Sequence, residues 1–302
     1  MKLVLILFIT CLYVDGSNRT YKRKLRVIID NDAETNSYTV TSQAECFKRC
    51  TEDCVALSYT ASEGRCKTFN RKFEDSSSSD ISISTMFFYR TAQDCEDVYP
   101  RNGSGVYHIE TQGGDTYNLY CDMETAGGPW NVIQNRGDGD VDFYRNWTSY
   151  KTGFGNLEGD FWLGNAMINK LTKQECKLLV QLEAWDGSMG YAEYARFQVA
   201  DEVNKYKVLV DGFTGNTSNS FERQSGYKFS TFDQDNDIFQ EHCAVVFRAG
   251  WWFKDCSSTN LNGPYASDTG TDKRLSMHWQ SFFSDRSTVL MKKSRMLIKR
   301  QK

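Results

Sequence analysis

The stretch DQDNDIFQEHCAVVFRAGWWFKDCSSTNLNG, residues 233–263, combines alternating carboxylates, two cysteines, a tryptophan pair and a turn rich in Asn and Gly. Its closely spaced carboxylates are Asp233, Asp235 and Asp237. They would repel one another unless a hard cation neutralised them, and carboxylate and carbonyl oxygens are the ligands that calcium takes. The helix-loop-helix calcium motif does not fit, because Ile238 stands where that motif needs Gly and Ala244 where it needs Glu. The stretch therefore predicts a calcium site of another kind, and a solvated acidic turn is the alternative.

Three further motifs precede this stretch: DCEDVYPRNGSGVYHI from Asp94, LYCDMETAGGPWNVIQNR from Leu119 and DFYRNWTSYKTGFGNLEGDFWLGN from Asp142. Together with FSTFDQDND, AGWWFKDC and NLNGPY, they resemble the fibrinogen C-terminal domain, the fold shared by fibrinogen chains, ficolins, tachylectins, tenascins and angiopoietins. We expect this domain over residues 95–302. The resemblance implies an α+β fold stabilised by disulfides, in which a mixed, mainly antiparallel sheet carries a loop-rich calcium subdomain.

The family's calcium ligands map onto a short segment of this sequence. The resemblance implies side-chain ligands from Asp235 and Asp237 and backbone carbonyl ligands from Phe239 and Glu241. Extracellular sites need not bind calcium tightly, and affinities of about 0.1 to 1 mM suffice where calcium is abundant. We expect the ion to hold the loop between Cys243 and Cys256 in shape.

In ficolins and tachylectins the same loop forms a pocket for the acetyl groups of sugars. The corresponding positions here are Phe247, Asp255, Cys256, Ser257, Lys273 and Arg274. The resemblance implies a cis peptide bond before Cys256, but Ser257 stands where the lectins have His, and Lys273 with Arg274 where they have Tyr and Ala. Two cations favour carboxylate or sulfate over an acetyl group. We therefore expect anionic ligands; the alternative is that both cations are solvated loop residues.

Near the start of the sequence, the basic residue Lys2 precedes the apolar run LVLILFITCLYV, and the small residue Gly16 lies two positions after that run. This pattern predicts a signal peptide over residues 1–16, too short to span a bilayer, and residues 17–24 are expected to be a disordered basic lead. No other stretch is apolar enough for a membrane helix, so we expect a secreted, extracellular protein. A net charge of −3 is too small to indicate a nucleic-acid partner. Expected glycosylation sequons lie at Asn18, Asn102, Asn146 and Asn216.

Nine cysteines remain once the expected signal peptide is removed, and a secreted protein favours disulfides between them. Cys176 begins an alternating strand pattern that places it on the same face as Leu178, Val180 and Leu182, towards the core. It is therefore expected to be a buried free thiol, and an intermolecular disulfide is the alternative. The family resemblance implies the pairs Cys95–Cys121 and Cys243–Cys256.

Residues 25–90 combine a helix candidate with short strands. Ser42 is the expected N-cap of a helix over residues 43–50, because Glu45 follows three positions later as in a capping box. The cysteine spacing resembles an apple-type (PAN) module, an α+β fold, and this resemblance implies Cys46–Cys66 and Cys50–Cys54. Residues 91–94 are the expected linker.

The basic tail has two interpretations, a site for heparin-like polyanions or an edge strand, because Met291, Met296 and Ile298 alternate with cations. The pair Trp251 and Trp252 is expected to supply at least one core side chain, with sugar stacking as the alternative. No collagen repeat or heptad run supports a particular homo-oligomer.

No catalytic motif is present, and the three histidines are scattered, so we expect no enzyme. The sequence predicts a secreted, calcium-dependent recognition protein of innate immunity that binds glycans or other anionic extracellular ligands. The alternative is a receptor ligand or matrix adhesion protein that binds a cell-surface protein through the same face.

Overall fold

The computed structural model describes residues 12–14, 20–24, 34–42, 45–46, 49, 56–69, 85–90, 92–98, 103–110, 115–267, 273–282 and 287–301. The protein divides into two compact units. The N-terminal unit comprises residues 1–93, 97–102 and 108–117, and the large unit comprises 94–96, 103–107 and 118–302.

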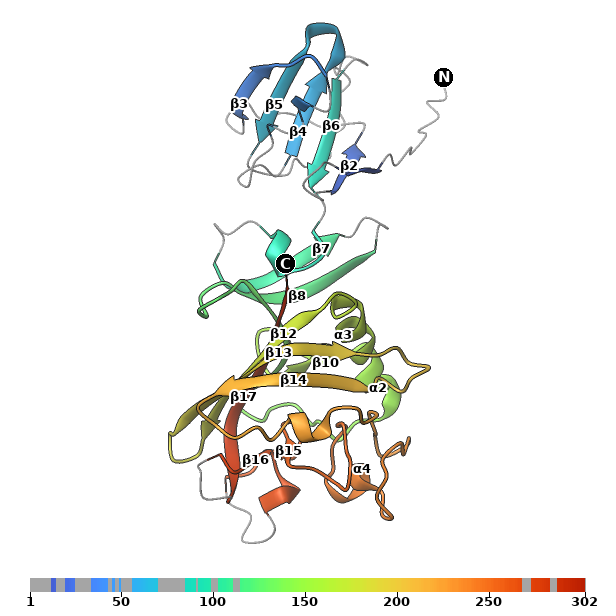
Figure 1. Cartoon of the computed structure of the whole chain (residues 1–302), viewed down its shortest axis with the longest axis vertical. Coiled ribbons are helices and arrows are strands. Elements are labelled where there is room, and N and C mark those ends of the chain that lie inside the picture. The colour runs from blue at the N-terminus through green and yellow to red at the C-terminus, as the bar shows by residue number, and fades with distance from the viewer. Residues whose placement is uncertain are drawn as a thin grey trace. The chain divides into compact units, whose positions relative to one another are not determined.

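The N-terminal unit contains an antiparallel sheet in the order β1-β2-β6-β4-β5-β3 (Figure 1). Its elements are β1 (Leu12–Val14), β2 (Thr20–Lys24), β3 (Glu34–Thr39), β4 (Ala56–Thr60), the 3-10 helix η2 (Ala61–Glu63), β5 (Arg65–Phe69) and β6 (Thr85–Arg90). A Cys46–Cys66 disulfide and the buried side chains of Leu57 and Tyr59 form its core. Strand β2 lies in the segment expected to be a disordered lead; it is ordered because its backbone pairs with β1 and β6.

The expected helix start is present in the N-terminal unit. The Glu45 amide donates to the Ser42 hydroxyl at 3.2 Å, which is the predicted N-cap. The Glu45 carboxylate differs from a capping box, because it accepts from the Thr41 amide at 2.8 Å. Cys50 and Cys54 lie outside the described residues, as does most of the expected signal peptide. The apple-type interpretation stays a prediction.

The large unit is built on one antiparallel sheet in the order β10-β11-β9-β17-β12-β13-β14, with β8 beside β9 and the β15–β16 pair beside β17. Strands β7 (Gly105–Glu110) and β8 (Thr116–Asp122) each contain residues of both units. The other strands of the large unit are β9 (Trp130–Arg136), β10 (Phe154–Gly155), β11 (Phe161–Trp162), β12 (Cys176–Ala184), β13 (Met189–Val199), β14 (Val208–Gly215), β15 (Thr259–Asn260), β16 (His278–Gln280) and β17 (Thr288–Arg300). Short helices complete it: η3 (Cys95–Asp97), α2 (Trp147–Thr152), α3 (Asn165–Leu171), η5 (Glu222–Gln224), α4 (Cys243–Val246) and η6 (Lys273–Leu275). The fold is thus mainly antiparallel sheet with few helices, as expected.

Strand β12 shows the predicted alternation. Cys176, Leu178, Val180 and Leu182 are all buried, and Cys176 is a free thiol. A second disulfide, Cys95–Cys121, ties the start of the large unit to β8.

Strand β17, which contains the basic tail, contradicts the interpretation of the tail as an edge strand. β17 lies between β9 and β12, inside the sheet. Its cations are matched by carboxylates of neighbouring segments: Arg295 pairs with Asp122 at 2.9 Å and Lys293 with Glu183 at 2.8 Å. A strand whose polar face is covered by opposite charges can occupy the centre of a sheet.

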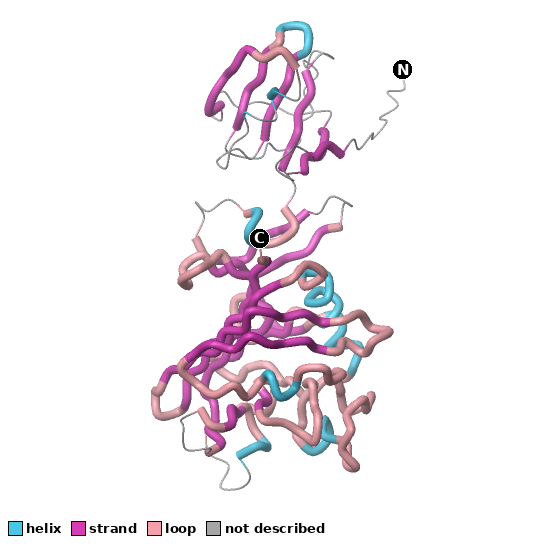
Figure 2. The backbone as a smooth tube through the Cα atoms, in the orientation of Figure 1, coloured by secondary structure: helices cyan, strands magenta, loops and turns pink. Residues whose placement is uncertain are grey.

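Aromatic side chains join the sheet to the loops that follow β14. Trp251 and Trp252 are both fully buried, so neither stacks on a sugar. Trp252 contacts Phe229 with ring centroids 5.2 Å apart, and Trp251 contacts Phe221 at 5.4 Å. Figure 2 shows that the segment between β14 and β17 is mostly loop. This core therefore positions a surface of irregular loops on a rigid sheet.

Candidate functional site

The acidic stretch forms a turn in which carboxylates bind backbone amides. Asp235 Oδ1 accepts from the Asp237 amide at 3.1 Å. The two oxygens of Asp237 accept from the amides of Phe239 at 2.9 Å and Cys243 at 3.0 Å. Asp233 lies apart from this pair, since its Oδ1 accepts from the Trp147 amide at the start of α2. Asp237 therefore joins the acidic turn to helix α4.

The electrostatics of this turn are unfavourable without a cation. Burial raises the pKa of the Asp237 carboxyl, and the nearby Asp235 carboxylate raises it further, while the bonds from Phe239 and Cys243 oppose the rise. No cationic side chain among the described residues forms an ion pair with Asp235 or Asp237. Two adjacent carboxylates, one of them partly buried, thus share a site without an internal counter-ion.

This arrangement fits a calcium ion by the chemistry of its donors. Each carboxylate oxygen retains acceptor capacity beyond one amide bond, and calcium takes several oxygen ligands in flexible geometry. Phe239 and Glu241, the expected carbonyl ligands, follow directly on an exposed turn. Within the described residues, however, no group of three His, Cys, Asp or Glu side chains is gathered as a metal cluster. A site here would depend on carbonyl oxygens as well as on the two aspartates.

The loop between α4 and β15 is closed by the Cys243–Cys256 disulfide, with Cα atoms 5.5 Å apart. Its far end is tied to the acidic turn, because the Ile238 amide donates to the Lys254 carbonyl at 3.3 Å. The Asp255–Cys256 peptide bond is cis, as expected from the resemblance. The turn and the disulfide loop therefore form one connected surface.

The expected pocket residues occupy different environments. Phe247 is buried and contacts Phe253 at a centroid distance of 6.0 Å, whereas Asp255 is exposed. The Ser257 hydroxyl donates to the Thr259 carbonyl at 2.7 Å, so its proton is already engaged. The two expected cations belong to the 3-10 helix η6: Arg274 is exposed, and the side chain of Lys273 lies outside the described residues.

The segment after the disulfide is fixed to the sheet by buried polar side chains. Gln134 on β9 donates to the Leu261 carbonyl at 2.9 Å, and Arg136 Nη1 donates to the Gly263 carbonyl at 2.9 Å. Asn262 donates to the Gly250 carbonyl at 3.0 Å and so links the segment back to the tryptophan pair. These anchors explain how irregular backbone is held in one conformation.

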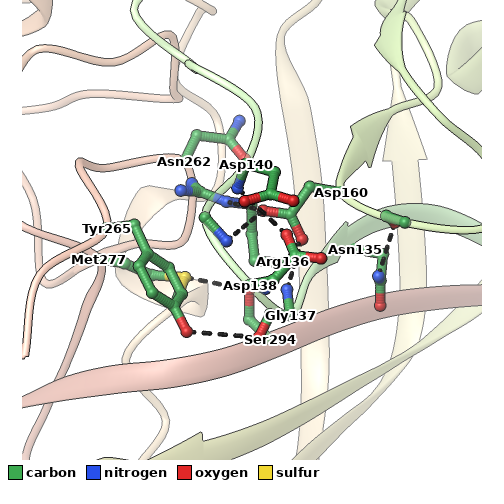
Figure 3. Close-up of polar contacts among 12 residues, drawn as sticks. Asn135, Arg136, Gly137, Asp138, Asp140, Asp160, Asn262, Tyr265, Met277 and Ser294 are labelled. Carbon is green, nitrogen blue, oxygen red and sulfur yellow. Dashed lines mark hydrogen bonds and ion pairs between the residues drawn. The ribbon is translucent and has the colours of Figure 1, made fainter.

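Arg136 is itself held by a buried ion pair that the sequence did not reveal. Its Nε lies 3.5 Å from Asp160 Oδ2 (Figure 3). The guanidinium carbon also lies over the Phe143 ring, 4.0 Å from the centroid. Asp160 also accepts from the amides of Gly137 and Gly139. Arg136 and Asp160 lie in two of the motifs that carry the family resemblance, but they are 24 positions apart in sequence, and neither motif indicates that the two side chains pair.

Two of the expected glycosylation sites can be placed. Asn146 and Asn216 are exposed, and each uses its side-chain oxygen to accept a backbone amide, from Ser149 and Tyr191 respectively. Asn18 and Asn102 lie outside the described residues. Glycosylation at any of them stays a prediction.

Comparison with known proteins identifies a matching family and several relatives. Residues 91–301 match the family described as fibrinogen beta and gamma chains, C-terminal globular domain. Angiopoietin-related protein 7 of Homo sapiens is 42% identical over 178 residues, which are 57% of this chain and 51% of the relative. Ficolin-3 of Homo sapiens is 41% identical over 180 residues, 59% of this chain and 60% of the relative. The chain thus spans about half the length of the angiopoietin-related relatives it matches.

One relative and two solved structures cover the domain more fully. Fibrinogen-like protein A of Apostichopus parvimensis is 38% identical over 205 residues, covering 67% of this chain and 71% of the relative. The fibrinogen-like globe domain of human ANGPTL2 superposes with a TM-score of 0.65 at 34% identity, over 70% of this chain and 99% of that domain. Lamprey fibrin D-dimer, complexed with the peptide ligand Gly-His-Arg-Pro-amide, gives 0.60 at 30% identity, over 68% and 72%. In the described residues of the present protein, no helix has the length and apolarity needed to cross a membrane.

Proposed function

The protein belongs to the family described as fibrinogen beta and gamma chains, C-terminal globular domain, and from this premise we propose that it is a secreted, calcium-dependent recognition protein for glycans. The binding surface would comprise the acidic turn, residues 235–241, and four positions of the disulfide loop, with Lys273 and Arg274 at its rim. These four positions are Phe247, Asp255, Cys256 and Ser257. One observation carries this proposal: an exposed surface of irregular loops is held rigid from below by a disulfide, buried aromatic rings and side-chain anchors from β9. Rigid display of loops limits the conformational entropy that binding would otherwise cost.

Calcium would have a structural role in this surface. Asp235 and Asp237 would hold the ion, with carbonyl oxygens of Phe239 and Glu241 as further ligands. The ion would supply the positive charge that the two carboxylates need. Because Asp237 also binds the Cys243 amide, the same carboxylate would transmit the ion's presence to the disulfide loop.

The ligand is expected to carry a negative charge. Ser257 offers no imidazole and its proton is already donated to Thr259, which weakens the case for a simple acetyl pocket. Arg274 is exposed in η6, where a guanidinium can form charge-assisted hydrogen bonds with a carboxylate or sulfate. Relatives named as ficolin and fibrinogen-like proteins support recognition rather than catalysis.

A glycan array, probed in calcium and in chelator, tests the proposal. We expect binding to acidic glycans in calcium, weak binding to simple N-acetyl sugars, and loss of the signal in chelator and in Asp237→Asn. Arg274→Ala should weaken the signal, and wild-type binding should fall as salt rises, since an exposed charge is screened over about 8 Å at physiological ionic strength. Binding to no saccharide under either condition would contradict the glycan proposal.

A protein partner is the second candidate, favoured by exposed apolar side chains on the same surface. Ile238 is 64% exposed, Phe239 44% and Val245 45%. Exposed apolar groups close together in sequence, beside charged residues, are typical of protein interfaces. The two candidates are separated by cell binding in the presence of competing glycans: a protein partner predicts binding that glycans leave unchanged and that Ile238→Asp abolishes.

A further inference from the structure

Three side chains from separate turns meet on the surface of the large unit, and we call them the Arg248 stack: Tyr144, Phe232 and Arg248. The rings of Tyr144 and Phe232 lie 4.9 Å apart, centroid to centroid, and are tilted by 49°. The Arg248 guanidinium carbon lies 5.2 Å from the Tyr144 ring centroid. Phe232 is 37% exposed, and Arg248 is exposed as well. An exposed cation and an exposed ring thus both contact the half-buried Tyr144.

Each member of the stack is held by local backbone bonds. The Tyr144 amide donates to Asp142 Oδ1 at 2.9 Å. The residues on either side of Phe232 form a two-way backbone bridge between Thr231 and Gln234. Arg248 follows α4 with a φ of 48°, a left-handed conformation that a long side chain adopts only where its surroundings impose it. The backbone positions from which the three side chains project are therefore fixed by local structure.

Arg248 differs in its charge balance from four arginines of this unit. Arg136, Arg196, Arg295 and Arg300 each pair with a carboxylate. Arg248 forms no ion pair with any carboxylate among the described residues; its guanidinium contacts the Tyr144 ring instead. Arg248 shares the lack of a carboxylate partner among the described residues with Arg145, which donates to the Asp142 carbonyl, and with Arg223, which donates to the Gln280 side chain. The five N–H donors of a guanidinium lie in one plane and form a fork that can bind an anion through two hydrogen bonds. A contact with an aromatic ring leaves these donors available.

We propose that the Arg248 stack is a second ligand subsite, which binds the sulfate or carboxylate group of an acidic saccharide. The fork of Arg248 binds the charged group, and the sugar ring lies against the exposed Phe232. Aromatic rings offer an apolar surface to the C–H face of a sugar without requiring hydrogen bonds. This subsite uses neither the acidic turn nor Ser257 and Arg274, and so goes beyond the proposed function.

A saccharide fits this surface better than a peptide does. Peptides are usually bound through a free strand edge, a hydrophobic groove for a helix or a series of side-chain pockets. The segments that carry the stack contain no sheet strand: Thr231 and Gln234 pair only with each other, and α4 has four residues. The stack offers one anion-binding fork and one ring-sized apolar surface, which is the complement of a single charged sugar residue.

The test compares variants that remove one cation each from the same disulfide-bonded region. Arg248→Asn removes the fork but keeps a residue that tolerates left-handed backbone, so the variant should fold. Lys254→Asn is the matched control, because Lys254 also lies over a tyrosine, Tyr227, at 5.5 Å. The probes are a heparin-derived octasaccharide, the same octasaccharide after desulfation and carboxyl reduction, and an oligo-glutamate peptide. Unchanged thermal unfolding confirms that each variant is folded.

We expect wild type to bind the sulfated octasaccharide and not its neutral form. Binding should be about tenfold weaker in Arg248→Asn, because a hydrogen bond to a charged group contributes about 1.5 kcal/mol or more. In Lys254→Asn the affinity should change at most twofold. Equal losses in the two variants would show general charge attraction and overturn the proposal. So would tighter binding of oligo-glutamate than of the octasaccharide, or no binding at all. Repeating the comparison in Asp237→Asn separates this subsite from the proposed function, because the Arg248 effect should persist there even if calcium-dependent array binding is lost.

Discussion

Two loops of the large unit are ordered in the same way, by a carboxylate that binds backbone amides, yet they differ in how that charge is balanced. Asp160 binds the amides of Gly137 and Gly139, and its counter-ion is the buried Arg136. Asp237 binds the amides of Phe239 and Cys243, and the nearby carboxylate of Asp235 raises its pKa. The first loop carries its own cation, whereas the second has like charge.

This difference indicates which loop depends on the solution around it. A buried carboxylate is stable when it is hydrogen-bonded and paired, and it is costly when either is missing. The Asp160 loop satisfies both conditions within the protein and supports the segment at Gly263 through Arg136. The Asp237 loop satisfies only the first, so its conformation is expected to respond to calcium.

The largest effect is expected at the internally paired loop. Asp160→Ala leaves the Arg136 guanidinium buried without its counter-ion and should lower the free energy of unfolding by about 3 to 5 kcal/mol. Burial already lowers the pKa of Arg136, and the Asp160 charge opposes that shift. Urea unfolding of the purified protein, in calcium, measures the loss.

Asp211→Ala is the control for this prediction, because Asp211 pairs with Arg196 at an exposed position. An exposed pair contributes about 0 to 1 kcal/mol. Similar losses in the two variants would mean that Asp160 acts no differently from a surface carboxylate, and the first half of the comparison would fail.

Calcium removal should have the next largest effect. At a calcium concentration about a hundredfold above Kd, binding to the folded state alone adds about 2.7 kcal/mol to the free energy of unfolding. Chelator should remove this increment from wild type. Asp237→Asn should have the same stability in both buffers, below that of chelated wild type, because Asn has one acceptor oxygen where Asp237 uses two. In Asp160→Ala the increment should remain, since that loop has its own cation. Identical melting of wild type with and without chelator would identify the acidic stretch as a solvated turn.

The sequence predicts a loop more completely when the residues that contact one another are close together in the chain. Asp235, Asp237 and Cys243 are neighbours in sequence, so the motif that predicted the turn also contains the residues that form it. The alternation around Cys176 likewise gave the buried face of β12, because strand periodicity is local. The pairs Cys95–Cys121 and Cys243–Cys256 came from the family resemblance and are present.

Long-range contacts could not be predicted in the same way. The pairing of Arg136 with Asp160 joins residues of different elements, and single charged residues in a sequence do not indicate their partners. The tail strand was placed wrongly at a sheet edge for a related reason. Alternating apolar and cationic residues look the same on an edge strand and on β17, whose cations are covered by Glu183 and Asp122 from neighbouring segments.

Alkaline pH should reveal a third buried acid, the thiol of Cys176, with a smaller effect. Burial raises the pKa of Cys176 from 9.0 to about 12, and the charge of Asp94 adds to the rise. Because the folded pKa is raised, the contribution to stability is complete below pH 9 and is lost between pH 9 and about 12. At pH 10 the loss should be about 1.4 kcal/mol.

Urea unfolding at pH 8 and pH 10 measures this loss, with Cys176→Ala as the comparison. The variant should lose less stability between the two pH values than wild type, even if it is less stable at both. Equal losses would show that Cys176 is as accessible to solvent in the folded protein as in the unfolded state, against its burial beside the carbonyls of Leu171 and Gln174.

The smallest effect is expected where a neutral side chain binds a backbone amide at the surface. Asn146 Oδ1 caps α2 by accepting from the Ser149 amide at 3.0 Å, and the side chain is exposed, so no buried charge is involved. In protein made without glycosylation, Asn146→Ala should lower the free energy of unfolding by about 1 kcal/mol, the usual value of a helix N-cap. Asn146→Asp should keep the cap, and Thr148→Ala should disrupt only the sequon and leave stability unchanged. When the protein is made in secretory cells, all three variants should lose the same glycan, because each destroys the Asn-x-Thr sequon. In wild type the cap and the glycan are compatible, since the cap uses the oxygen of Asn146 and leaves its amide nitrogen for the sugar. If Thr148→Ala destabilised the unglycosylated protein as much as Asn146→Ala does, the cap would not be the source of the effect.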